Sequence, residues 1–234
     1  MKTELVWSCD QFRDHLIDIS DGKLLPVTEY PDRIQLSSGW RESLAQLRDE
    51  STDGLERWSW ITRKRPLKLV YLQRSFLVGQ ENRVDGREIA KLRNRIRQAG
   101  MTDFIGGVHS HPVKDLERVK KRFWGLFKRV EKIQHIASTN AMDLYFMVTP
   151  HILMSIMGVV EGNESLFAFR TRESVSMALS SEVFNQENFV TYWHMLFPSV
   201  SESSLRIAER HKLVFYRGEL GDELVKSFTP SLNS

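Results

Sequence analysis

Two histidines at the end of one apolar segment are the residues of this sequence best placed to do chemistry. Residues 104–112 read Phe-Ile-Gly-Gly-Val-His-Ser-His-Pro, and Pro112 stops the apolar run after His109-Ser110-His111. Side chains of a strand alternate between its two faces, so His109 and His111 are expected to point the same way. Catalytic zinc sites commonly have three protein ligands and one open position. The pair therefore predicts two of the three protein ligands of a metal site.

The composition limits which ligands such a metal could have. Of the 234 residues, 41% are hydrophobic and 27% are charged, and the net charge of +3 is mild. No run of about 18 apolar residues occurs, so no membrane span is predicted, and the start of the chain does not resemble a signal peptide. Cys9 is the only cysteine, which leaves histidine and carboxylates as ligands. We expect a reducing, cytoplasmic location.

The elements that must position the pair alternate between short helices and strands. Helices are expected at 10–19 with Asp10 as cap, from Ser37 or Ser38 to Asp49, and at 85–99; strands are expected at 34–37, 55–62, 67–72, around 76–77 and at 103–109. In the strand at 55–62, alternation places Glu56 on the same face as Trp58 and Trp60. A carboxylate among tryptophans is unusual, and Glu56 is a candidate base for the metal site.

The net positive charge of the chain is concentrated in residues 113–137. Apolar residues recur at spacings of three and four, which predicts a long amphipathic helix with eight basic and three acidic residues. Its basic face is either solvated, a lid over the site, or a docking surface for an acidic partner or a membrane surface. Nucleic acid is disfavoured because no recognised nucleic-acid motif accompanies the helix.

The rest of the chain is expected to continue with strands and one clear helix. The predicted strands are 144–149, 151–160 and 166–171, with a hairpin turn at 161–164, then a helix at 202–212, a strand at 212–216 and a loose tail at 227–234.

The order of these features resembles the JAMM (JAB1/MPN/Mov34) metalloprotease family. That family has a glutamate on an early strand, then His-x-His-Pro, then Ser-x-x-Asp, and the resemblance extends from about Ile34 to Thr171. It implies an α/β (α+β) fold of the MPN/cytidine-deaminase-like type, a mixed β-sheet flanked by helices. The domains expected are an N-terminal extension at 1–33, a catalytic domain at 34–172 that contains the basic helix, and a C-terminal extension at 173–234.

The motif assigns roles to four residues of this chain. His109 and His111 match the two zinc-binding histidines, Asp143 matches the third ligand, and Glu56 matches the catalytic glutamate. With these ligands Zn²⁺ keeps a fourth position for water, whose pKa it lowers, and Glu56 would act as the general base.

Two departures from the family pattern leave alternatives open. Asn140 stands where the family has serine, so the donor to the oxyanion is the Asn140 amide, or the hydroxyl of Ser138 or Thr139. The predicted basic helix also separates the histidines from Asp143, which the family keeps close. Asp115 is the competing candidate for the third ligand, but it would open the predicted helix, and no hairpin is expected behind it.

The resemblance implies a zinc-dependent peptidase or isopeptidase that cleaves after the C-terminus of a ubiquitin-like protein, in deconjugation or in precursor processing. The short chain is most similar to stand-alone prokaryotic members, which serve ubiquitin-like conjugation, sulfur-carrier processing or antiviral defence. The alternative function is a catalytically silent MPN-type module that binds partners through the basic helix and the C-terminal extension. A third is a zinc hydrolase of another amide. The oligomeric state is left open.

Overall fold

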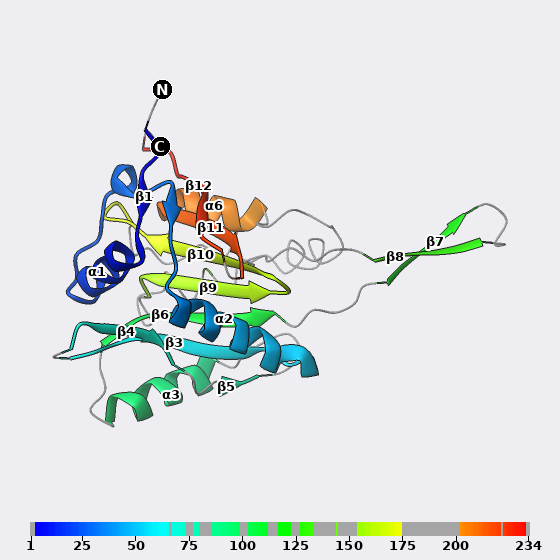
Figure 1. The fold of residues 1–234 in the computed structure, drawn as a ribbon, viewed down its shortest axis with the longest axis horizontal. Coiled ribbons are helices and arrows are strands. Elements are labelled where there is room, and N and C mark those ends of the chain that lie inside the picture. The colour runs from blue at the N-terminus through cyan, green and yellow to red at the C-terminus, as the bar shows by residue number, and fades with distance from the viewer. Residues whose placement is uncertain are drawn as a thin grey trace.

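A ten-stranded mixed sheet with helices on both faces organises the computed structural model of the chain (Figure 1). The structure describes residues 3–65, 67–73, 77–79, 86–98, 103–111, 117–122, 127–132, 144, 154–174, 202–220 and 222–232. This mixed α/β architecture agrees with the predicted fold class at that level. Within the described residues, no helix is both long and apolar enough to cross a membrane.

The strand order of the sheet is β1-β2-β12-β11-β10-β9-β6-β3-β4, and β5 also pairs with β3. The bounds are β1 Val6–Trp7, β2 Arg33–Ile34, β3 Arg57–Lys64, β4 Leu69–Leu72, β5 Leu77–Val78, β6 Asp103–His111, β9 Ile156–Glu161, β10 Glu164–Arg170, β11 Leu213–Glu219 and β12 Leu224–Phe228. The pairs β1·β2 and β6·β9 are parallel, and the other neighbours are antiparallel. The strand that carries His109, β6, is therefore the neighbour of β3, which Glu56 directly precedes.

Each face of the sheet has its own apolar core. On one face, Phe12 of α1 (Cys9–Ser20) and Leu44 of α2 (Ser38–Glu50) pack in a cluster with Ile61 of β3. On the other face, α3 (Gly86–Gln98) and α6 (Glu202–Arg210) contribute Ile89 and Ile207 to a cluster with Trp58 and Trp60. The alternation along β3 explains this division, because residues of opposite parity point to opposite faces. The predicted helices at 37–49, 85–99 and 202–212 are confirmed in the described residues.

The first helix is capped two residues earlier than its sequence suggested. Ser8, not Asp10, is the N-cap, and its hydroxyl accepts the backbone N–H of Gln11 while the Gln11 side chain accepts the N–H of Ser8. Both orphan donors at the helix start are thus satisfied, which is the capping-box arrangement. The prediction of Asp10 as cap was wrong because Ser8 and Gln11 form a capping box, which starts the helix earlier.

The predicted basic helix at 113–137 is wrong where the structure describes this segment. Residues Glu117–Arg122 form β7 and residues Phe127–Lys132 form β8, which pair in a separate antiparallel two-stranded sheet. An antiparallel strand pair therefore does follow Asp115, contrary to the prediction. This ribbon extends away from the main sheet (Figure 1). The register places Val119 opposite Val130 and Glu117 opposite Lys132. β-branched and opposite-charge cross-strand pairs stabilise a ribbon, and Gly125, between the two strands in sequence, disfavours a helix interior.

The hairpin after the site is confirmed, with β9 and β10 joined at Gly162-Asn163 and Gly162 at a φ of 58°. Two other predictions need correction. The tail at 227–234 was expected to be loose, but β12 reaches Phe228 and pairs with β11 and β2. Leu144, expected to begin a strand, is helical, and the remainder of that predicted strand lies outside the described residues. The segments assigned to the N- and C-terminal extensions both contribute strands to the main sheet, and the division into domains stays a prediction.

Candidate metal centre

The end of β6 brings His109 and His111 together on one face of the sheet. Their Nε2 atoms lie 3.0 Å apart. Two nitrogens bound to one zinc at tetrahedral geometry, with Zn–N of about 2.0 Å, would lie about 3.3 Å apart. The rings cross at 64° with centroids 4.9 Å apart, so both can direct a nitrogen at one point. The two nitrogens lie within hydrogen-bonding distance of each other, and a separation about 0.3 Å larger would suit two ligands of one ion.

The two imidazole rings are held by different neighbours. His109 is 4% exposed and is stacked on Trp58, with ring centroids 5.7 Å apart and an interplanar angle of 15°. Trp58 and His109 are directly opposed in the register of β3 and β6, which places both on the α3 and α6 face. His111 instead has its Nδ1 atom 3.3 Å from Oε2 of Glu161, at the end of β9. The stacked indole and the carboxylate thus each restrict one of the two rings.

The pair Gly106-Gly107 allows β6 to lie close to its neighbours. A Cβ atom on Gly107 would lie 2.0 Å from Cζ2 of Trp58, and one on Gly106 would lie 2.1 Å from the carbonyl oxygen of Ile156. Neither position has room for a methyl group. Gly107 thus leaves the space in which the indole of Trp58 reaches His109.

Glu56 enters the site from the residue just before β3. The register pairs Arg57 with Ser110, and continued by one residue it puts Glu56 across from His111. The backbone carbonyl of Glu56 accepts the N–H of Gly79, and Glu56 is 8% exposed. Opposed residues of an antiparallel pair share a face. The predicted base and the two histidines therefore belong to the same face and the same end of the sheet.

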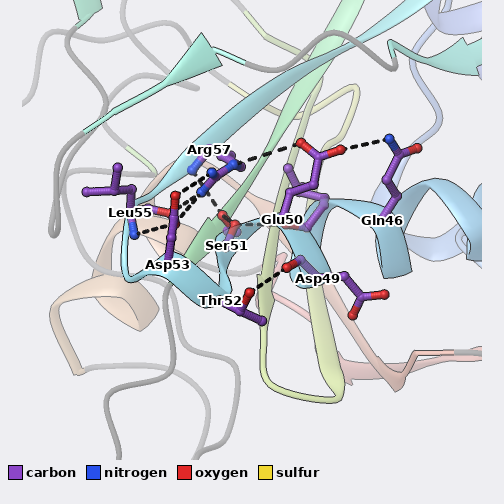
Figure 2. A network of polar contacts seen from close by, with 10 residues as sticks. Gln46, Asp49, Glu50, Ser51, Thr52, Asp53, Leu55 and Arg57 are labelled. Carbon is purple, nitrogen blue, oxygen red and sulfur yellow. Dashed lines mark hydrogen bonds and ion pairs between the residues drawn. The ribbon is translucent and has the colours of Figure 1, made fainter.

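A bidentate ion pair fixes the turn that leads into Glu56 (Figure 2). Both terminal nitrogens of Arg57 donate to the carboxylate of Asp53 at 2.7 Å, and Asp53 also accepts the N–H of Leu55 at 3.0 Å. The hydrogen bond from Arg57 lowers the pKa of Asp53 to about 2, aided by that of Leu55. Arg57 is itself buried. The charged Asp53 side chain thus holds the loop on both sides of Glu56.

A chain of buried hydroxyls connects the same turn to the histidine strand. Ser51 donates to the carbonyl of Leu47 in α2 at 2.8 Å, and Ser110 accepts the N–H of Arg57 at 3.0 Å. The two hydroxyl oxygens are hydrogen-bonded to each other. Since the proton of Ser51 is already directed to Leu47, Ser110 must be the donor in that bond. Each group in this chain donates to the next: the Arg57 N–H to Ser110, Ser110 to Ser51, and Ser51 to the carbonyl of Leu47 in α2. These hydrogen bonds set the position of β6 against β3.

Several predicted site residues lie outside the described residues, namely Ser138, Thr139, Asn140, Asp143 and the alternative ligand Asp115. Leu144, which follows Asp143 in the chain, is fully buried in the cluster that contains Trp58. Within the described part of the chain, no group of three or more His, Cys, Asp or Glu side chains is arranged to hold a metal ion. The structure thus brings the two histidines together, and the continued register of β3 and β6 places Glu56 across from His111.

Sequence reasoning missed Glu161 and the serine chain. The sequence indicates only a turn at Glu161, and its position beside His111 follows from the parallel pairing of β6 with β9, in which the two residues are directly opposed. Ser51 and Ser110 are 59 residues apart and carry no local signal of their contact. The strand register, which a single sequence does not give, is what reveals both.

Comparison with known proteins adds no assignment: no protein-family description matches the chain, and no curated protein is significantly similar to it.

Proposed function

We propose that the protein is a zinc-dependent peptidase or isopeptidase of the JAMM type. The observation that carries the proposal is the pair His109 and His111, with Nε2 atoms 3.0 Å apart at a strand end where the register continues to Glu56. Two imidazoles and a carboxylate on one sheet face are the components that such hydrolysis needs. Asp143 is proposed as the third ligand. A Zn²⁺ ion held there supplies Lewis-acid activation of a water molecule and of the scissile carbonyl group.

The residues of the chain divide the remaining chemistry among them. Glu56 takes a proton from the attacking water and gives it to the leaving amine, which is general acid–base catalysis by one carboxylate. The Asn140 amide, or the Ser138 hydroxyl, donates a hydrogen bond to the oxyanion of the tetrahedral intermediate. The Arg57–Asp53 pair and the Ser110–Ser51 bond hold Glu56 and His111 in register. Preorganisation of this kind avoids reorganisation during the reaction.

The proposed substrate is a ubiquitin-like protein, cut at the peptide or isopeptide bond that follows its C-terminus. This substrate class follows from the resemblance in the order Glu56, His109-Ser110-His111-Pro112 and Asp143. The ten-stranded mixed sheet with helices on both faces is compatible with the proposed MPN-type fold. The basic ribbon β7·β8, which replaces the expected helix, is the proposed docking element for an acidic partner or an acidic face of the substrate.

Metal content and cleavage of a ubiquitin-like fusion protein test the proposal. Purified wild-type protein should contain about one zinc per chain, and His109→Ala should lose it. Glu56→Gln should keep the metal and lose cleavage by about 10²-fold or more, as expected for a missing general base. Glu42→Gln is the matched control, because Glu42 is an exposed carboxylate of α2 and should leave both readouts unchanged.

Each failure has a distinct meaning. Wild-type protein without stoichiometric zinc would refute the metallopeptidase function. Zinc binding without cleavage of any ubiquitin-like fusion would favour the silent interaction module or a hydrolase of another amide. Zinc-dependent cleavage that Glu56→Gln leaves intact would show that another group is the base.

A further inference from the structure

Glu161 lies beside the proposed metal ligand His111 although no part of the motif includes it. It is the last residue of β9, the parallel neighbour of β6, and the register places it directly opposite His111. The β9–β10 turn follows at once, with Glu161 paired to Glu164. The position is therefore fixed by strand pairing on both sides and does not depend on a long loop.

The contact is made on the side of the imidazole ring that faces away from the other histidine. Oε2 of Glu161 lies 3.3 Å from Nδ1 of His111, whereas Nε2 of His111 lies 3.0 Å from Nε2 of His109. One ring cannot direct both nitrogens at the same ion. A metal held between the two Nε2 atoms would thus have Glu161 behind His111, in contact with the ligand and not with the metal.

A carboxylate at Nδ1 determines which form of the imidazole is present. It accepts a hydrogen bond only from a protonated Nδ1, and in the neutral ring this tautomer leaves the lone pair on Nε2 for a metal. The side chains of His111 and Glu161 are 16% and 13% exposed, so little water competes for the bond. Carboxylates in this position orient metal-binding histidines and raise their basicity, and their loss typically weakens metal binding about 10- to 100-fold.

We propose that Glu161 is a positioning residue that holds His111 in the orientation and tautomer needed for metal binding. The inference rests on the proposed function, because it requires that His111 binds a metal. It goes beyond that function by assigning a role to a residue outside the motif. His109 is held by its stacking on Trp58. His111 is held instead by its contact with the carboxylate of Glu161.

The neighbouring strand offers a matched control. Glu164 is directly opposite Glu161 in the β9·β10 register, but its carboxylate accepts hydrogen bonds from Arg217 at 2.6 and 3.0 Å. Glu164→Gln removes one negative charge from the same row of the sheet and leaves the His111 contact in place. A general effect of charge on the metal would appear in both variants, and a positioning effect only at Glu161.

The experiment is a measurement of metal affinity, independent of peptidase activity. Wild-type, Glu161→Ala, Glu161→Gln and Glu164→Gln proteins are titrated with Zn²⁺ in competition with a chromophoric chelator, and their Co²⁺ complexes are compared by visible absorption. Glu161→Ala should bind zinc about 10- to 100-fold more weakly and alter the Co²⁺ spectrum. Glu161→Gln should recover part of the affinity, since the carboxamide oxygen still accepts from Nδ1–H, and Glu164→Gln should stay within about twofold. Urea unfolding of the metal-free proteins checks that each variant folds.

The outcomes separate this proposal from the one on which it rests. If wild-type protein and Glu161→Ala bind zinc equally and with the same Co²⁺ spectrum, Glu161 does not position His111, while the metal centre stands. If Glu164→Gln weakens binding as much as Glu161→Ala, the effect is one of charge and the positioning role is refuted. If the wild-type protein binds no metal, both proposals fall together.

Discussion

Replacing Gly107 by alanine should damage the metal centre through Trp58, without touching a ligand. A methyl carbon at this position would lie 2.0 Å from Cζ2 and 2.7 Å from Cε2 of Trp58. An ordinary carbon–carbon contact is about 3.5 Å or longer, so the indole must move by about 1.5 Å. The indole is nevertheless held by Trp60, at a centroid distance of 5.5 Å, and by the ring of His109. The strain therefore cannot be relieved without loss of aromatic contacts.

The expected cost follows from these two effects. Overpacking of a filled core costs about 1–3 kcal/mol, and an aromatic contact contributes about 0.5–1.5 kcal/mol beyond its burial. We expect Gly107→Ala to lower the free energy of unfolding by about 2–4 kcal/mol, measured by urea denaturation followed by circular dichroism. Because the ring of His109 loses the surface on which it stacks, the zinc affinity should fall as well.

A double-mutant cycle identifies Trp58 as the cause. The colliding atoms belong to the six-membered ring of the indole, which phenylalanine would not place there, so Trp58→Phe should make Gly107→Ala less costly by at least about 1 kcal/mol. Gly106→Ala is the control, because its methyl group would meet the carbonyl oxygen of Ile156 instead. Its cost should be the same in the wild-type background and in the Trp58→Phe background. A cost below about 0.5 kcal/mol for Gly107→Ala, or no relief from Trp58→Phe, would refute this account.

Four further predictions concern other parts of the molecule. Burial lowers the pKa of His15 to about 4 from 6.5, so its contribution to stability is complete above pH 6.5 and lost as the pH falls toward 4. The free energy of unfolding should fall by about 2 kcal/mol between pH 7.5 and pH 5, measured by urea titrations at both pH values. An equal fall in His15→Phe would contradict this assignment. Ser110→Ala removes the acceptor of the Arg57 N–H and should cost about 1–3 kcal/mol in unfolding free energy, whereas a neutral effect would show the serine chain to be dispensable. Gly162→Ala, at a φ of 58°, should cost about 1 kcal/mol, and a stabilised hairpin would contradict the turn geometry. Asn140→Ala should reduce kcat by about 10²-fold or more with zinc content unchanged; unaltered kcat would return the oxyanion role to Ser138.

The sequence revealed the parts of the site that lie within one strand or helix. The facing of His109 and His111 follows from alternation alone, and α2 follows from apolar spacing and its serine start. By contrast, the contact of Glu161 with His111 depends on which strand pairs with β6 and in which register. A parallel pairing is nonlocal, and a single sequence carries no record of it.

The segment at 113–137 was predicted wrongly for a different reason, because its sequence is compatible with both a helix and a pair of strands. Residues 113–137 repeat apolar side chains at helical spacing, but the same residues also place Val119 and Val130 where two strands can pair them. Helix propensity is a weak guide when tertiary or cross-strand pairing opposes it. The start of α1 was predicted wrongly for a more local reason. Asp10 is a residue type that commonly caps helices, but the capping box is formed by two residues three apart, Ser8 and Gln11.

The pairing of β12 with β2 has a practical consequence for any shortened form of the protein. Leu224 lies opposite Ile34, and β11 pairs with β10 along seven residues. A chain cut after residue 172 would lack β11, and β10 would become an edge strand. Its backbone N–H and C=O groups on that side would have no strand to pair with. Such an edge is a template for pairing with other chains, so a fragment designed to hold only the motif residues should aggregate more readily than the full chain.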